Sequence, residues 1–106
     1  MGALSKMLGG FSARGKATSL YKLGIKRAGD RDTEGAISAY TDVIKMNRAP
    51  LDVRAMALLN RALAYSLLHD NEKAHVDLSA VMEIPQAPAQ VIAAAKDKLH
   101  RMRRSR

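Results

Sequence analysis

The sequence predicts an all-α solenoid of helical hairpins, and three observations predict it. The chain resembles itself when it is shifted by 38 residues, apolar residues recur at intervals of three and four, and a short acidic turn occurs twice at equivalent positions. A repeat of this length is typical of stacked supersecondary units, and spacings of three and four indicate amphipathic helices. Few strand signals compete, so we expect two and a half repeats built from five helices.

The 38-residue repeat includes apolar, capping and proline positions. The matched pairs are Asp32 with Asp70, Glu34 with Glu72, Ala36 with Ala74, Tyr40 with Leu78, Val43 with Val81, Ala49 with Ala87 and Pro50 with Pro88. The match places repeats at about 12–49 and 50–87, followed by a half repeat at 88–104 that we expect to be a C-terminal capping helix. Residues 1–11 are expected to form a flexible or amphipathic segment, and residues 105–106 the end of a basic tail.

Capping signals set the expected helix ends. Helices are predicted near residues 14–28, 33–47, 51–68, 71–83 and 89–103. Asp32 and Asp70 are natural N-caps, and Gly29 suits the C′ position that follows a helix. Pro50 and Pro88 are expected at the first position of a helix, where a missing N–H costs little.

Small residues mark the centre of each predicted hairpin. Gly24 with Ala36, and Ala62 with Ala74, are expected to let the two helices of a hairpin approach closely. The surrounding motifs are Leu20-x2-Leu23-Gly24-x2-Arg27 then Ala36-x3-Tyr40, and Leu58-x2-Arg61-Ala62-x2-Tyr65 then Ala74-x3-Leu78. In these motifs the chain resembles the tetratricopeptide repeat (TPR) family over about residues 12–104.

The resemblance implies a right-handed superhelix of helical hairpins, although the chain departs from the family pattern at three points. Its period is 38 residues where about 34 is usual, leucine stands in place of the signature tryptophan, and Arg27 stands where an aromatic residue is usual. The extra residues extend the loops before Pro50 and Pro88.

Composition limits the classes of protein that fit. At 106 residues the chain is expected to form one domain with its own core, and it has no cysteine for disulfides, thiolate metal sites or nucleophiles. No apolar run approaches the length of a membrane span, so we expect a soluble cytoplasmic protein. The net charge is +8, with an acid-free N-terminal stretch of 29 residues and a basic C-terminus. Basic ends leave open an alternative in which the protein associates with RNA or with an anionic membrane surface.

Two stretches come close to ligand-binding loops. GDRDTEGA, residues 29–36, begins like a calcium loop, but Thr41 occupies the position of the bidentate glutamate. Its copy, HDNEKA, keeps the capping aspartate and the glutamate of the first turn but not Gly35, so we interpret both as turns within hairpins. GFSARGKA, residues 10–17, resembles a phosphate loop, but Ala17 replaces the required hydroxyl and no strand precedes it.

We therefore expect no cofactor, no metal site and no enzymatic activity. His69, His75 and His100 lack the spacing of metal ligands, and no serine has the context of a nucleophile.

The TPR resemblance implies a concave groove lined by the first helix of each pair, which would bind a peptide or helix of another protein. The implied groove positions are Tyr21, Lys22, Ile25, Met56, Leu59, Asn60, Leu63, Asp97, Lys98 and Arg101. Apolar anchoring is expected from Tyr21, Ile25, Met56 and Leu63, and polar fixing from Asn60, Lys98 and Arg101. An acidic partner would suit the basic end.

Members that bind the C-terminal carboxylate of chaperones use five polar clamp positions. Of these the chain keeps Asn60 and, with a like charge, Lys98, whereas Tyr21, Ile25 and Ala94 differ. The resemblance therefore does not extend chaperone-tail binding to this chain.

Three alternatives for the apolar groove residues stay open. Met56, Leu59 and Leu63 could be ordinary core, since a stripe at helical spacing usually is. A homodimer could bury the groove. The N-terminal segment could cover it, because its apolar residues also recur at three and four: Met1, Leu4, Met7, Leu8 and Phe11.

Overall fold

The computed structural model describes residues 12–104, and within this range the chain is entirely helical. The helices are α2 (Ala13–Gly29), α3 (Thr33–Lys45), α4 (Leu51–Leu67), α5 (Asn71–Met82) and α6 (Ala89–Arg104). The prediction of five helices in residues 12–104 is confirmed, and each end lies within two residues of its predicted place. Residues 1–11 and 105–106, for which an amphipathic segment and a basic tail end were predicted, lie outside the described range.

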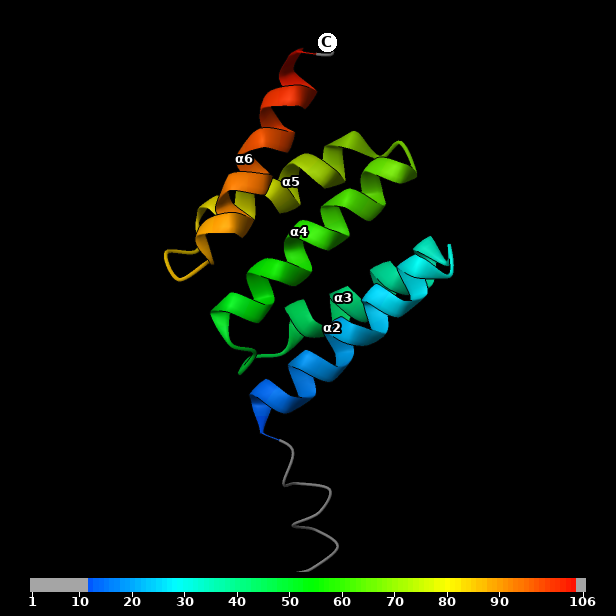
Figure 1. Cartoon of the computed structure of the whole chain (residues 1–106), viewed down its shortest axis with the longest axis vertical. Coiled ribbons are helices and arrows are strands. Elements are labelled where there is room, and N and C mark those ends of the chain that lie inside the picture. Colours follow the sequence, from blue (N-terminus) through cyan, green and yellow to red (C-terminus); the bar gives the residue numbers. More distant parts are fainter. Residues whose placement is uncertain (1–11, 105–106) are drawn as a thin grey trace, which may run out of the picture.

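The helices form two hairpins and a final helix, arranged in two layers (Figure 1). α2 packs against α3 and α4 against α5, while α4 also contacts α3 and α6 contacts α5. In addition α2 contacts α4 and α4 contacts α6, and these three helices lie in front of α3 and α5 in Figure 1. α4 is therefore the central helix, in contact with all four others of residues 12–104.

The turns inside the two hairpins are copies of one structure. After α2, the N–H of Asp32 donates to the carbonyl of Arg27 at 2.8 Å, and the N–H of Arg31 to that of Ala28 at 3.0 Å. The equivalent bonds after α4 run from Asp70 to Tyr65 at 2.9 Å and from His69 to Ser66 at 3.0 Å. This pattern is a Schellman motif, whose C′ residue adopts the left-handed conformation.

The position of Gly29 in this turn differs from the prediction. Gly29 is the last residue of α2, and the C′ residues are Arg31 and His69, with φ of 64° and 61°. The Schellman bonds fix the C′ residue two positions later than the glycine, so the expected C′ role of Gly29 was wrong.

Aspartate capping explains the acidic stretch without an ion. The carboxylate of Asp32 accepts from the N–H of Gly35 at 2.9 Å, and that of Asp70 from Lys73 at 3.2 Å. Asp30 pairs with Lys26 at 3.0 Å. Both predicted N-caps are confirmed, and GDRDTEGA is the turn of a helical hairpin.

The predicted starts of α4 and α6 are confirmed at residues 51 and 89, but the two prolines lie one position earlier than expected. Pro50 is the N-cap of α4 rather than its first helical residue, and Pro88 likewise precedes the first residue of α6. Ser12 caps α2 by accepting from the N–H of Gly15 at 2.9 Å. Gly15 and Lys16 therefore lie in the first turns of a helix, not in a phosphate-binding loop.

The core is built from small side chains around four large ones. Tyr40, Val43, Leu78 and Val81 are the largest fully buried side chains of the described residues, and Ala36, Ala62 and Ala74 are buried beside them. An ion pair crosses this core. The guanidinium of Arg61 donates to the carboxylate of Asp77 at 2.8 and 2.7 Å and to the hydroxyl of Thr41 at 3.1 Å. Arg61 thus joins α4 to α5 and to α3.

Candidate functional site

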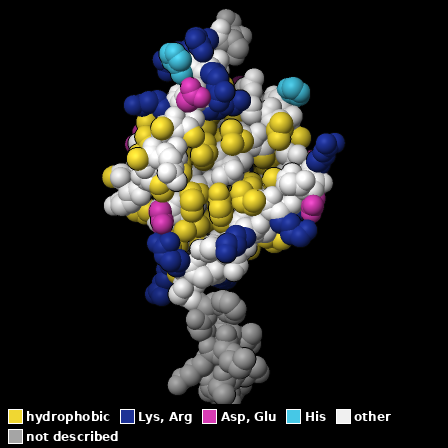
Figure 2. All heavy atoms as spheres, in the orientation of Figure 1, with side chains coloured by type: hydrophobic (Ala, Val, Ile, Leu, Met, Phe, Trp, Pro, Cys, Tyr) yellow, Lys and Arg dark blue, Asp and Glu magenta, His cyan; other side chains and the backbone are white. Residues whose placement is uncertain are grey.

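A stripe along α4 defines the surface on which the predicted groove residues lie. Asp52, Met56, Leu59, Asn60, Leu63 and Leu67 recur at helical spacing. We call the surface formed by this stripe with Tyr21, Lys22 and Ile25 of α2 and Lys98 and Arg101 of α6 the α2–α4–α6 face. Figure 2 shows hydrophobic side chains gathered in the middle of the side on which these helices lie, with Lys and Arg around the rim.

The exposed apolar part of this face consists of leucine and isoleucine. Leu63 is 39% exposed and Ile25 42%. Leu67, one turn beyond Leu63, is 72% exposed and was not predicted as a site residue. Its i, i+4 spacing from Leu63 is the signal that could have found it.

Tyr21 and Asn60, both predicted groove residues, are joined by a hydrogen bond. The side-chain amide of Asn60 donates to the Tyr21 hydroxyl at 3.0 Å and to the Met56 carbonyl at 2.9 Å. Burial raises the pKa of Tyr21, and the bond from Asn60 acts in the opposite direction. Both N–H donors of the amide are therefore used within the chain. These two residues form a fixed polar point on the face.

Met56 and Leu59 are partly buried rather than free. Met56 packs against both core clusters, and Leu59 against the cluster that contains Leu58 and Leu78. The interpretation of these two residues as core therefore holds in part. Leu63, the third residue of that alternative, is exposed and remains available on the face.

An ion pair closes one end of the face. The guanidinium of Arg14 donates to both oxygens of Asp52 at 3.1 Å, and these residues are 38 positions apart, at equivalent places in the two repeats. The hydrogen bonds from Arg14 lower the pKa of Asp52. The pair joins the first turns of α2 and α4. Opposite charges at positions one repeat apart are a signal that sequence reasoning could have used.

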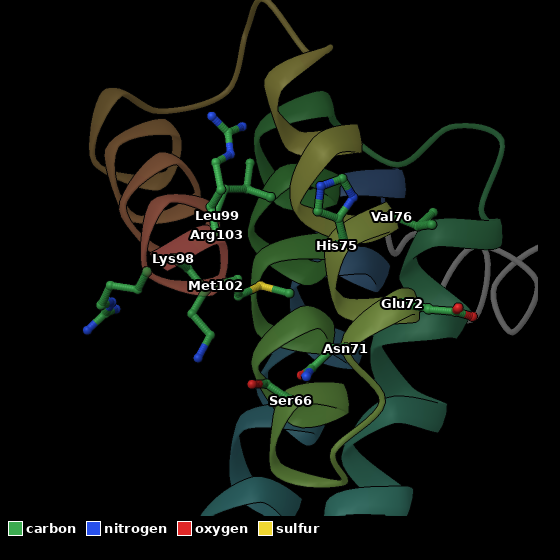
Figure 3. Close-up of a pocket in the computed structure, with 10 residues that line it drawn as sticks. Ser66, Asn71, Glu72, His75, Val76, Lys98, Leu99, Met102 and Arg103 are labelled. Atoms are coloured by element: carbon green, nitrogen blue, oxygen red, sulfur yellow. The ribbon is translucent and has the colours of Figure 1, made fainter. Parts of the chain in front are cut away.

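A cleft lies between α5 and α6 at the end of α4, and it contains two of the predicted residues. Its volume is about 930 Å³, and its lining includes Glu72, His75 and Val76 of α5 with Lys98, Leu99, Arg101, Met102 and Arg103 of α6. In Figure 3 Leu99 and Met102 extend from α6 toward α4, and His75 projects from α5 beside them. Lys98 and Arg101 therefore belong both to the α2–α4–α6 face and to this α5–α6 cleft.

The outer side of α6 differs from the equivalent side of α4. In α4, Leu58 and Ala62 are buried and Tyr65 is partly buried, all against the core that includes α5. The positions 38 residues later hold Lys96, His100 and Arg103, which are exposed around a shallow hollow of about 470 Å³. Because these charged and polar residues stand where α4 has core residues, this side of α6 is suited to contact with water.

Within residues 12–104, no group of three or more potential metal-binding side chains is placed to hold an ion. No helix in that range is long and apolar enough to cross a membrane. Comparison with known proteins gives no match: no family model, no curated protein and no solved structure matches the chain.

Proposed function

We propose that this protein is a TPR-like adaptor that binds a segment of another protein on the α2–α4–α6 face. The observation that carries the proposal is the exposed apolar stripe on the central helix, Leu63 and Leu67, with exposed Ile25 at the position of α2 equivalent to Leu63. A contiguous apolar surface with a polar rim is typical of interaction sites in soluble domains. Helical or extended segments bind such surfaces through a few apolar anchors.

The TPR-like part of the proposal is supported by the equivalence of the two hairpins. They share one turn structure and one capping pattern, and the Arg14–Asp52 pair joins equivalent positions of the first and second repeats. The first helices of successive repeats lie side by side, as they would in a solenoid. The charged outer side of α6 fits the role of a capping helix at 88–104.

A binding role fits the polar groups on the face better than a catalytic one. The side-chain N–H donors of Asn60 are used on Tyr21 and Met56, and the Asp52 carboxylate is held by Arg14. Polar groups that are fixed by bonds within the chain can orient a bound segment. A general base, in contrast, needs a polar atom that is free to reach its substrate. The fixed polar points would set the register of the bound segment, and the leucines and Ile25 would supply the affinity.

A pair of matched substitutions tests the face. Leu63→Asp places a charge in the apolar stripe, whereas Leu51→Asp changes a residue of similar exposure, 41%, on another side of the same helix. Proteins captured by the full chain would be purified and their affinities measured for both variants. We expect Leu63→Asp to weaken binding by about tenfold or more and Leu51→Asp to leave it unchanged.

Two outcomes contradict the proposed face. Equal affinity of both variants for every purified partner would show that the face is not the binding surface. Conversion of a dimeric wild type to a monomer by Leu63→Asp, observed by light scattering, would instead assign the face to self-association.

A further inference from the structure

The α5–α6 cleft has a floor that suits an apolar side chain. Leu99 and Met102 are partly buried against the core, and Val76 on the opposite wall is 65% exposed. Figure 3 shows these α6 side chains directed toward α4. A cleft of about 930 Å³ is in the range of sites that take several side chains or a small ligand.

The charges around the cleft are mainly positive. Lys98, Arg101 and Arg103 come from one stretch of α6, and Glu72 of α5 is the acid among the lining residues. Arg101 pairs with Asp97 at 3.2 Å. Asp52, the acid of the neighbouring α2–α4–α6 face, is paired with Arg14. The three cations outnumber the one acid of the lining, so an approaching carboxylate meets a net positive charge.

We infer that the α5–α6 cleft binds an acidic stretch of the partner segment, with an apolar side chain on Leu99 and Met102 and carboxylates on Lys98 and Arg103. The inference rests on the proposed function, because it extends the same bound segment from the face into the cleft. Lys98 and Arg101 lie on both surfaces, so a segment along α4 that passes Leu63 reaches the cleft. The partner is thus an amphipathic segment with acidic residues at one end.

The lining favours a protein segment over a nucleic acid. Proteins that bind single-stranded RNA stack its bases on aromatic side chains. The apolar lining of this cleft is aliphatic and thioether, from Val76, Leu99 and Met102, and no tyrosine or phenylalanine of the described residues lines it. Aliphatic surfaces of this kind complement leucine, isoleucine or methionine side chains of a peptide.

Two synthetic peptides provide the probe. Both carry the same apolar positions at helical spacing over about 15 residues, and their polar positions are all glutamate in one and all lysine in the other. Each peptide is titrated into the full-length isotope-labelled chain and followed by NMR. We expect the glutamate peptide to bind at least about tenfold more tightly than the lysine peptide, with an affinity that falls as salt is added. The amide signals of Val76, Leu99 and Met102 should shift.

A charge-reversal variant with a matched control tests the cations. The double variant Lys98→Glu with Arg103→Glu should lower the affinity for the glutamate peptide by about tenfold or more. Lys45→Glu with Arg48→Glu lowers the net charge by the same amount at exposed positions around the end of α3. This control should leave the affinity within about twofold of the wild type.

The outcomes separate the cleft from the face. Absence of binding of the glutamate peptide up to about 1 mM, equal affinity for the lysine peptide, or an equal loss in the control variant overturns the inference. Shifts confined to the surroundings of Ile25 and Leu63 overturn the inference and support the proposed function. Affinity that survives Leu63→Asp but is lost in Lys98→Glu with Arg103→Glu supports the cleft and contradicts the proposed face. Tighter binding of a uridine oligonucleotide that displaces the peptide overturns the protein assignment.

Discussion

The ring of Tyr40 occupies the space into which a side chain at Gly24 would project. A Cβ on Gly24 would lie 2.3 Å from Cε1 of the tyrosine, closer than any real contact of that kind. One repeat later alanine replaces the glycine and leucine replaces the tyrosine, at Ala62 and Leu78, and both are buried in one cluster. The close approach predicted at Gly24 was expected to involve Ala36. The side chain that requires a glycine there is instead the ring of Tyr40.

This contact predicts that Gly24→Ala destabilises the protein. The added methyl group must displace a fully buried ring, which costs about 1 to 3 kcal/mol of the free energy of unfolding, although alanine is the better helix former. Gly29→Ala is the matched control, since nothing lies within 4 Å of a Cβ at that position. It should be neutral or stabilising by up to about 1 kcal/mol, measured by urea denaturation.

A double variant separates this contact from general damage to the helix. Gly24→Ala with Tyr40→Leu recreates the pair found at Ala62 and Leu78 in the second repeat. We expect the two changes to couple favourably by about 1 to 2 kcal/mol, so that the double variant is more stable than the sum of the single effects predicts. If the two losses of stability are simply additive, the added methyl group does not clash with the Tyr40 ring.

The buried pair of Arg61 and Asp77 predicts a larger effect. Their side chains are 17% and 4% exposed, and the hydrogen bonds with Asp77 raise the pKa of Arg61. Asp77→Ala leaves a buried guanidinium without its carboxylate, which should cost about 3 to 5 kcal/mol of the free energy of unfolding. Thermal and urea denaturation measure this loss.

The first repeat supplies the compensating change for this pair. Its equivalents of Arg61 and Asp77 are Leu23 and Ala39. Arg61→Leu with Asp77→Ala should therefore recover at least about 2 kcal/mol relative to Asp77→Ala alone, because no buried charge remains. A double variant as unstable as Asp77→Ala would show that the bond to Thr41 or the volume of the arginine matters more than the charge.

The fold followed from local patterns, whereas the site depends on distances between helices. Capping aspartates and apolar spacing located the five helices of residues 12–104 because these signals act within a few residues. The C′ position was predicted wrongly because a glycine is usual there, whereas this chain has Arg31 and His69. The Tyr21–Asn60 bond and the α5–α6 cleft depend on how closely α2 approaches α4 and on how far α6 opens from α5, which no single segment specifies.

The left-handed residues of the two turns predict stabilising substitutions. Arg31 and His69 adopt φ of 64° and 61°, a conformation that costs a residue with a Cβ about 1 to 2 kcal/mol. Glycine avoids this cost but is more flexible when unfolded, so Arg31→Gly and His69→Gly should each stabilise by about 0.5 to 1 kcal/mol. Arg31→Ala, which keeps the Cβ, should give no such gain. A loss of stability in both glycine variants would show that these side chains make contacts that matter.

The two neighbouring tyrosines predict a loss of stability in alkaline solution. Burial raises the pKa of Tyr21 and of Tyr40 above the ordinary value of 10.0, and the proximity of the rings, whose centroids are 6.0 Å apart, adds to the rise for Tyr40. A group whose pKa is raised by folding contributes stability that is complete below its unfolded pKa and is lost as the pH rises through the folded value.

Wild-type stability should therefore fall once the pH exceeds about 10, because the unfolded chain releases tyrosine protons that the folded chain retains. Tyr21→Phe removes one of these protons and should make the fall shallower, and Tyr21→Phe with Tyr40→Phe shallower still. Urea denaturation at a series of pH values from about 8 to 11 measures the slope, and the variants differ from the wild type only in the tyrosine hydroxyls. If the free energy of unfolding fell with pH equally in the wild type and the double variant, neither tyrosine would hold its proton more firmly in the folded protein than in the unfolded chain.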